Sequence, residues 1–196
     1  FVGATIREDL KEGNQQKGYE ITGFDSDKKV LLVMGGSLGS KKLNDIIREN
    51  LEALLHDYQI IHLTGHGLVD ESYKQKGYIQ YEFVKEELTH LLSITDTVVS
   101  RAGSNAIYEF LTLRIPMLLI PLGLDQSRGD QIDNAKYFES KGYGKMIPED
   151  QLTQFKLLEQ LKQIESHRND IIHQIESYKE SYTKEDLFNK ILNDAL

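Results

Sequence analysis

Cysteine is absent from the 196 residues of this chain. Disulfide bonds and thiolate-bound metal sites are therefore excluded, because both need cysteine sulfur. A chain without cysteine fits a reducing compartment best, and we expect a cytoplasmic protein. The six histidines include only one close pair, His62 and His66, with no third ligand at metal spacing. We predict no metal site and no bound cofactor.

Long apolar runs and basic clusters are also lacking. No run approaches the roughly 20 apolar residues of a transmembrane helix, so the sequence predicts no membrane span. The net charge of −8 comes without a cluster of Lys and Arg. Because binding to phosphate backbones and to anionic lipid depends on such clusters, we expect neither nucleic acid nor an electrostatic membrane patch as a partner of this chain.

The chain starts without an initiator methionine or a signal peptide. Phe1 opens the polar stretch FVGATIREDL, which has neither a charged head nor an apolar core. We expect a domain taken from a longer protein, whose other part holds half of the chemistry. The length of 196 residues is sufficient to bury a core, and one domain is the first expectation.

Three familiar enzyme signatures are missing as well. The glycine-rich stretch MGGSLGS at residues 34–40 is not followed by the Gly-Lys-Ser/Thr of a Walker loop. Its spacing differs from the dinucleotide fingerprint, and no Asp or Glu ends the next strand-like run, QIIHL, to bind a ribose. No Gly-x-Ser-x-Gly elbow occurs, so a hydrolase triad has no anchor.

Apolar, β-rich runs alternate with helical patterns about six times from Lys29 onward. Strands are expected at residues 29–35, 58–65, 77–84, 95–103, 115–123 and 143–147. Helices are expected at residues 40–55, 68–75, 85–94, 104–113 and 130–142. Such alternation is typical of right-handed crossovers. We predict an α/β fold with a doubly wound, about six-stranded parallel sheet of the Rossmann-like type.

Composition divides the chain into three parts. Residues 1–28 are polar and rich in glycine, and we interpret them as an interdomain connector. Residues 29–147 carry the Rossmann-like pattern. Residues 148–196 are charged amphipathic helices, which we assign to the same domain. Their apolar positions either cover this domain alone or pack partly on a further, N-terminal domain, and we expect the partial packing.

The glycine-rich turn is a candidate anion site. Ligands of an open parallel sheet bind outside the carboxyl ends of the strands, where the turn at residues 35–40 is expected to lie. Its glycines allow close backbone approach, Ser37 offers a hydroxyl, and the next helix points free N–H groups at a guest. The stretch alone does not distinguish this from a simple tight connection.

The stretch SRAGSNAIYEF is more informative. Gly103 marks the passage from strand to helix, Ser104 and Asn105 are good helix-capping residues, and Glu109 falls in the first turns of the helix. This pattern predicts a second anion-binding helix N-terminus, with a carboxylate that can accept hydrogen bonds from two sugar hydroxyls. The alternative for Glu109 is an ordinary solvated glutamate that interacts with the helix dipole.

A long polar loop, PLGLDQSRGDQIDNA, can curl over the same edge of the sheet. It supplies donors and acceptors of the kind that bind sugar hydroxyls: Asp125, Gln126, Arg128, Asp130, Gln131 and Asn134. The alternative interpretation is a solvated loop.

Four stretches in this order and spacing resemble a known family: FVGATIRED, GGSLGSKKLN, SRAGSNAIYE and IPMLLIPLGLDQSRGDQIDNA. They are similar to the donor-binding C-terminal half of the MurG family, up to about Gly144 and more loosely beyond. The family has the GT-B fold and transfers N-acetylglucosamine from UDP to lipid I, which yields lipid II for peptidoglycan. The resemblance implies one half of such a glycosyltransferase.

The resemblance also implies the residues that bind UDP-N-acetylglucosamine. Arg7 would reach the diphosphate and Ser37 the phosphates, while backbone groups at Val84 would read the uracil. Contacts are further implied for Gly103, Ser104 and Asn105 around the nucleotide, for Glu109 on the ribose hydroxyls, and for Asp130 and Gln131 near the sugar. Two stretches depart from the family: GATIR lacks the usual Asn and Pro, and RGDQ replaces a Gln pair, which leaves the role of Asp130 open.

By resemblance the reaction is an inverting transfer to the C4 hydroxyl of a lipid-linked muramoyl pentapeptide. Helix N-termini and Arg7 would neutralise the leaving UDP without a metal. The general base and the lipid I acceptor would belong to the N-terminal half, so this chain alone should bind donor without turnover, and the full-length protein should be peripheral on the cytoplasmic membrane face. Two alternatives stay open: another GT-B UDP-sugar transferase, such as a glycolipid synthase, and a non-catalytic nucleotide-binding domain.

Overall fold

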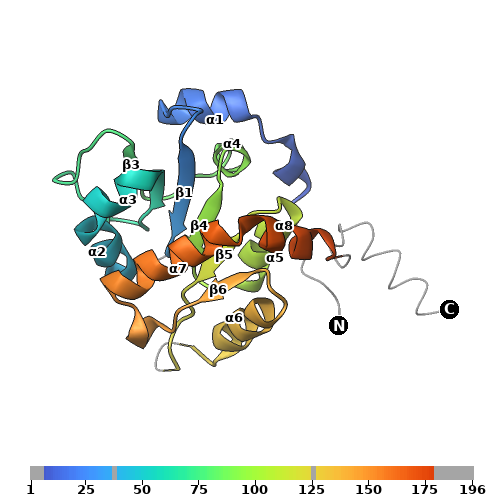
Figure 1. The fold of residues 1–196 in the computed structure, drawn as a ribbon. Coiled ribbons are helices and arrows are strands. Elements are labelled where there is room, and N and C mark those ends of the chain that lie inside the picture. Colours follow the sequence, from blue (N-terminus) through green and yellow to red (C-terminus); the bar gives the residue numbers. More distant parts are fainter. Residues whose placement is uncertain (1–6, 37–38, 125–126, 179–196) are drawn as a thin grey trace.

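The computed structural model describes residues 7–36, 39–124 and 127–178, which form a parallel sheet covered by helices (Figure 1). The strands are β1 (Lys29–Met34), β2 (Tyr58–Leu63), β3 (Tyr78–Tyr81), β4 (Thr97–Ser100), β5 (Met117–Leu119) and β6 (Gly144–Met146). Their order in this part of the chain is β3-β2-β1-β4-β5-β6, and every neighbouring pair is parallel. The predicted doubly wound, six-stranded α/β fold is confirmed.

Helices cover both faces of the sheet. Those between the strands are α2 (Lys41–Glu49), α3 (Leu51–Asp57), α4 (Leu88–Ser93), α5 (Ser104–Thr112) and α6 (Asp130–Ser140). Because parallel crossovers are right-handed, the change of direction after β3 places α2 and α3 on one face and α4, α5 and α6 on the other. After β6 come η2 (Glu149–Gln151), α7 (Gln154–Ser166) and α8 (Arg168–Glu176), and α7 crosses the face of the sheet that α2 and α3 cover (Figure 1).

The strands form where the sequence is continuously apolar. Val30 to Val33 of β1 are fully buried, and every residue of β2 is buried. Such runs are typical of parallel strands that are covered by helices on both faces. The core is therefore the sheet itself together with the inward faces of its helices.

The strand order creates a switch point between β1 and β4. The chain leaves β1 toward β2 and β3, returns to β4 on the other side of β1, and then continues outward to β5 and β6. The backbone N–H of Arg101, just after β4, donates to the carbonyl oxygen of Met34 at 3.3 Å. The turns that follow these two strands are thus adjacent, at the place where ligands of this architecture bind.

Two expected helices differ from the structure. Residues 68–75, expected as a helix, are irregular apart from a turn at residues 71–72 and a single bridge between Gln75 and Tyr78. Asp70 accepts hydrogen bonds from the backbone N–H (3.0 Å) and the hydroxyl (2.6 Å) of Ser72, and the Gln80 amide donates to the Asp70 carbonyl at 2.8 Å. These side chains satisfy backbone groups that a helix would pair internally. The expected helix 40–55 is interrupted at Asn50, whose amide nitrogen bonds back to the carbonyl of Ile46 at 2.6 Å.

The segment before β1 packs against α4. It contains η1 (Glu8–Glu12) and α1 (Gln15–Thr22). A Cβ at Gly13 would lie 2.4 Å from the carbonyl oxygen of Thr89, and one at Gly18 would lie 2.5 Å from that of His90. Glycine at these positions therefore allows the close approach of the two segments. Whether residues 1–28 connect two domains stays a prediction.

The C-terminal helices cover the sheet and reach its amino edge. Leu157, Leu161 and Ile164 of α7 are buried. The guanidinium of Arg168 donates to the Asp96 carbonyl, at 2.9 Å from both terminal nitrogens, and to the Thr97 hydroxyl at 2.8 Å. Residues 179–196 lie outside the described ranges, so packing of this tail on a further domain stays a prediction.

Within the ranges described, no helix combines the length and the apolar character that crossing a membrane requires.

Candidate functional site

Two charged residues from distant parts of the chain meet beside α5. Arg7 precedes η1, and Glu109 lies in the second turn of α5. The Nε of Arg7 donates to Oε1 of Glu109 at 3.1 Å. The Arg7 side chain is 36% exposed and that of Glu109 is 15% exposed. The structure thus brings together two residues that the sequence analysis names as candidate donor contacts.

Burial and charge act in opposite directions on Glu109. Burial raises the pKa of its carboxyl group, because the charged form loses water, while the guanidinium of Arg7 lowers that pKa, and burial has the larger effect. Asp9, whose carboxylate lies 3.9 Å from the Arg7 Nε, adds a small further increase to the pKa of Glu109. With a side chain that is 15% exposed and paired with Arg7, Glu109 is less solvated than the alternative interpretation assumes, and its contact with a ribose stays a prediction.

The N-terminus of α5 is open, and the expected capping is wrong. Gly103 is the N-cap residue, no side chain of the described residues caps the helix, and Ser104 and Asn105 are the first helical residues, with exposed side chains. The first N–H groups of a helix have no partner within it. Since no described side chain occupies them, these groups can bind an anion on the same helix as Glu109.

The loop after β5 is held against this helix terminus by α6. The Oε1 of Gln131 accepts the backbone N–H of Leu122 at 3.2 Å, and the amide of Asn134 donates to the carbonyl of Ala102 at 3.0 Å. Asp130 is the first residue of α6, after Gly129 at φ +91°, and is exposed. Gln131 and Asn134 therefore serve partly as structural ties, while Asp130 faces solvent.

The turn after β1 requires glycine at specific positions. Gly39 has φ +74°, and a Cβ there would lie 2.1 Å from the carbonyl oxygen of Thr64. Ser40 caps α2 by accepting the N–H of Leu43 at 3.3 Å. Ser37, the predicted phosphate contact in this turn, lies outside the described residues, as do Asp125 and Gln126 of the loop after β5.

Val84 occupies the segment between β3 and α4 and packs partly against the core. The described contacts connect it to neither Arg7 nor Glu109, so its predicted place at the uracil stays a prediction.

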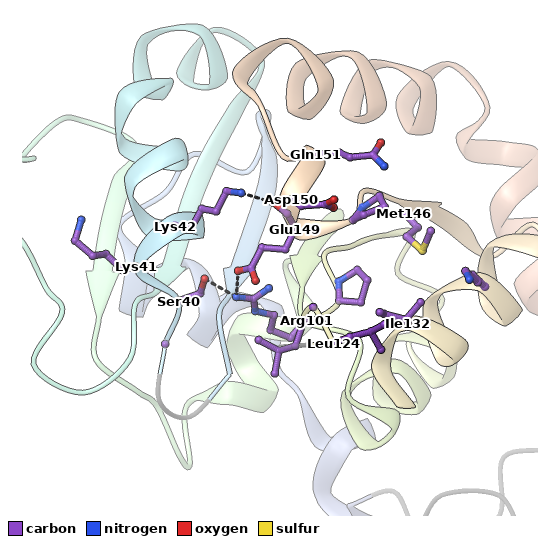
Figure 2. A pocket seen from close by; sticks show the side chains of 16 residues that line it. Ser40, Lys41, Lys42, Arg101, Leu124, Ile132, Met146, Glu149, Asp150 and Gln151 are labelled. Atoms are coloured by element: carbon purple, nitrogen blue, oxygen red, sulfur yellow. Dashed lines mark hydrogen bonds and ion pairs between the residues drawn. The ribbon is translucent and has the colours of Figure 1, made fainter. Parts of the chain in front are cut away.

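A cavity of 890 Å³ opens at the same edge of the sheet (Figure 2). It is lined by the start of α2, by Arg101, by the segment after β5, by Ile132 and Lys136 of α6, and by Met146 and residues 148–151. The guanidinium of Arg101 pairs with Glu149 and donates to the hydroxyl of Ser40 at 2.6 Å, as Figure 2 shows. Of the predicted site residues within the described ranges, none lines this cavity.

Sequence reasoning missed Arg101 and Glu149. Arg101 stands in the stretch SRAGSNAIYEF, but its type is common on surfaces and nothing in the pattern marks it as buried. In the structure its side chain is only 8% exposed, and Nη1 also donates to the carbonyl of Ile120 at 3.1 Å. One guanidinium thus ties β5, the start of α2 and η2 together beneath the candidate site.

His62 belongs to a buried hydrogen-bond network. Its Nδ1 lies 2.8 Å from the hydroxyl of Tyr78, and its Nε2 lies 2.9 Å from Oδ1 of Asn44. Burial, with a smaller contribution from Arg48, lowers the pKa of His62 to about 3, so the ring is neutral at physiological pH. The described part of the chain contains no group of three or more side chains arranged to hold a metal ion.

Comparison with known proteins gives consistent matches. Residues 30–191 match the model of the glycosyltransferase family 28 C-terminal domain. A Staphylococcus haemolyticus protein is 84% identical over all of this chain and 55% of its own length. A Staphylococcus aureus protein is 70% identical over the same shares of both chains. Both bear the name UDP-N-acetylglucosamine--N-acetylmuramyl-(pentapeptide) pyrophosphoryl-undecaprenol N-acetylglucosamine transferase. The chain spans about half the length of these relatives.

Solved structures show the same fold. The crystal structure of Acinetobacter baumannii MurG is similar with a TM-score of 0.72 at 22% identity, over 90% of this chain and 53% of that one. A calicheamicin glycosyltransferase is similar with a TM-score of 0.65 at 17% identity, over 89% of this chain and 41% of that one. At these identities the likeness concerns the fold alone, which is the Rossmann-like half of the GT-B fold.

Proposed function

Because this chain belongs to the glycosyltransferase family 28 C-terminal domains, we propose that it is the donor-binding half of an N-acetylglucosaminyltransferase that converts lipid I to lipid II. The observation that carries the proposal is the pairing of Arg7 with Glu109 beside the open N-terminus of α5. The names of the staphylococcal relatives support the choice of substrate. We infer that the donor is UDP-N-acetylglucosamine.

Each part of this donor has a chemical match at the edge of the sheet. Glu109 accepts the two ribose hydroxyls, and the free N–H groups of Gly103, Ser104 and Asn105 take phosphate oxygens. Arg7 and Ser37 add to the diphosphate contacts. Backbone groups at Val84 bind the uracil, and Asp130 and Gln131 bind hydroxyls of the N-acetylglucosamine. The hydrogen bond that Gln131 makes with Leu122 uses its amide oxygen and not its amide nitrogen.

The transfer asks for two kinds of assistance. As the bond from the sugar C1 to the diphosphate oxygen breaks, negative charge develops on UDP, and fixed N–H dipoles with Arg7 stabilise it without reorganisation. The C4 hydroxyl of the lipid I muramoyl group forms the new bond to C1 with inversion and gives its proton to a general base. We place that base, and the lipid I contacts, in the part of the relatives that this chain does not span.

The same proposal sets the location. An enzyme that takes a nucleotide donor and a lipid-linked acceptor works where both are present, so we place the full-length protein in the cytoplasm, peripheral on the inner face of the cell membrane. This chain contributes the donor side and binds neither nucleic acid nor lipid.

Calorimetric titration of the chain with UDP-N-acetylglucosamine, UDP-glucose and UDP tests the proposal. We expect binding of all three, with preference for UDP-N-acetylglucosamine over UDP-glucose. A clear preference for the glucose donor would contradict the assignment to lipid II synthesis. The absence of binding to any uridine nucleotide at millimolar concentration would contradict every donor-binding function, including that of another GT-B transferase.

Replacing Glu109 tests the ribose contact directly. We expect Glu109→Ala to weaken UDP binding about 10- to 100-fold, because hydrogen bonds to a charged acceptor contribute about 1.5–3 kcal/mol. Glu52→Ala is the matched control, since Glu52 is an exposed glutamate on α3. Unchanged affinity in Glu109→Ala would mean that the carboxylate makes no contact with the nucleotide.

A further inference from the structure

The carboxylate of Glu109 makes one hydrogen bond with the described residues, which leaves most of its acceptor positions without a partner among them. Among the described residues, Arg7 is the only group that hydrogen-bonds this carboxylate, through Nε to Oε1 at 3.1 Å. A carboxylate has two oxygens and about four lone-pair positions. Oε2 and part of Oε1 therefore stay available to a ligand while Arg7 remains in place.

The guanidinium of Arg7 is partly buried and only partly satisfied. Its Nη2 is buried and has no hydrogen-bond partner in the described part of the chain. The carboxylate of Asp9 lies 3.9 Å from Nε, beyond hydrogen-bond distance. Since the guanidinium directs its one described hydrogen bond at Glu109, the geometry of Glu109 depends on Arg7.

We propose that Arg7 is a positioning residue, which holds the Glu109 carboxylate in the orientation that accepts the two ribose hydroxyls. This inference rests on the proposed function, because it takes Glu109 as the ribose contact. It assigns to Arg7 a role in recognising the nucleoside, in addition to any contact with phosphate.

The electrostatics of the site favour this role. Two charged groups from the segment around η1 act on Glu109: the Arg7 guanidinium, which lowers the pKa of Glu109, and the Asp9 carboxylate, which raises it. Burial also raises that pKa. Without Arg7 both remaining influences favour the protonated form, in which one carboxyl oxygen carries a hydrogen and donates instead of accepting.

Uridine separates positioning from phosphate binding, because it carries the ribose and no phosphate. We expect Arg7→Met to weaken uridine binding about tenfold, as Glu109→Gln does, because both changes remove the oriented carboxylate. Arg7→Lys should recover part of the loss, because it keeps the positive charge. If Arg7 acts on phosphate alone, Arg7→Met leaves uridine affinity unchanged and weakens only UDP, which would overturn the proposal.

The pH dependence of UDP-N-acetylglucosamine binding gives a second readout, since the diphosphate diester of this donor does not titrate near neutral pH. We expect affinity to fall as pH is lowered through the pKa of Glu109. In Arg7→Met this fall should move to higher pH, and in Arg7→Lys it should stay near that of the unmodified chain. Glu109→Gln should bind weakly with no such fall. An unmoved midpoint in Arg7→Met would contradict this effect of Arg7 on Glu109.

Arg114→Met is the matched control. It makes the same change at the far end of α5, where Arg114 pairs with Glu176 at 3.5 Å and is exposed. We expect its affinity and pH profile to equal those of the unmodified chain. The two hypotheses fail differently: if the unmodified chain binds neither ligand, the proposed function is wrong and this inference falls with it, whereas binding that ignores Arg7 overturns this inference alone.

Discussion

Arg101 carries a positive charge into the interior of the protein, beneath the turn that follows β1. Its side chain is 8% exposed and that of its ion-pair partner Glu149 is 10% exposed. Such a pair contributes little compared with well-packed apolar side chains, but removal of one member is strongly destabilising. We interpret Arg101 as a residue that fixes how three segments lie relative to one another: the start of α2, the end of β5 and η2.

Removal of the Arg101 guanidinium should therefore be costly. We expect Arg101→Met to lower the free energy of unfolding by about 3 kcal/mol, because the buried carboxylate and two acceptor oxygens lose their cation together. Denaturant unfolding measures the loss. The control Arg114→Met breaks an exposed pair and should cost only about 0–1 kcal/mol. Equal costs for the two variants would show that Arg101 is replaceable.

At this scale the sequence predicts some residues of the site and cannot predict others. The sequence predicts Glu109 as a site residue because its distance from Gly103 places it on a helix that begins at a strand end. It does not predict the pairing of Glu109 with Arg7, because contact between residues so far apart in the chain depends on how η1 packs. The capping error at Ser104 and Asn105 has a local cause: the helix begins at Ser104 itself, so that Gly103, which has no side chain, is the N-cap residue.

At the scale of single elements, the turn between β1 and α2 shows how closely the backbone is packed. Gly36 and Gly39 both have positive φ, at +85° and +74°. The two glycines differ in the room available for a side chain. No described atom lies within 4 Å of a Cβ built on Gly36, whereas a Cβ built on Gly39 would lie 2.1 Å from the Thr64 carbonyl oxygen. Conformation and packing can thus be tested separately in one turn.

We expect Gly36→Ala to lower the free energy of unfolding by about 1–2 kcal/mol, because a residue with a Cβ is strained in the left-handed conformation. Gly39→Ala should cost more, because the backbone of the turn must also move away from Thr64. Thermal unfolding of the two variants compares them directly, and nucleotide affinity should fall further in Gly39→Ala. Similar melting temperatures would mean that the turn adapts without strain.

The elements differ in how well their sequence predicts them. The strands were predictable because continuous apolar runs leave few alternatives in a chain with helical segments between them. The error at residues 68–75 arose because the side chains of Asp70 and Gln80 make hydrogen bonds with the backbone there. Gln80 lies in β3, outside the segment itself. The break at Asn50 has a weaker signal, since asparagine also occurs inside helices. The conformation of such segments depends on contacts with residues from other parts of the chain.

At the scale of the whole molecule, acid stability should depend on one buried histidine. His62 has a pKa of about 3 in the folded protein, whereas an unfolded histidine has about 6.5. Below pH 6.5 the unfolded chain takes up a proton that the folded protein does not bind. The stability that His62 supplies is therefore fully present above pH 6.5 and is lost as pH falls from there toward 3.

We expect the free energy of unfolding to decrease by about 1.4 kcal/mol between pH 7.5 and pH 5.5 through His62 alone. His62→Gln should lose that part of the pH dependence, though it starts from lower stability. His56→Gln, which removes an exposed histidine, should retain it. Chemical denaturation at the two pH values provides the comparison, and the same slope in His62→Gln would exclude His62 as its source.

The central place of β1 has a consequence for the synthesis of the protein. Lys29 of β1 pairs with Tyr58 of β2, while on the other side Leu31 pairs with Thr97 of β4. On the ribosome β1, β2 and β3 are synthesised before β4. Until β4 is present, the edge of β1 that pairs with β4 has no partner strand. An unpaired apolar edge is a template for association with other chains. The strand order that creates the switch point thus also creates an interval of aggregation risk during translation, which ends when β4 is inserted.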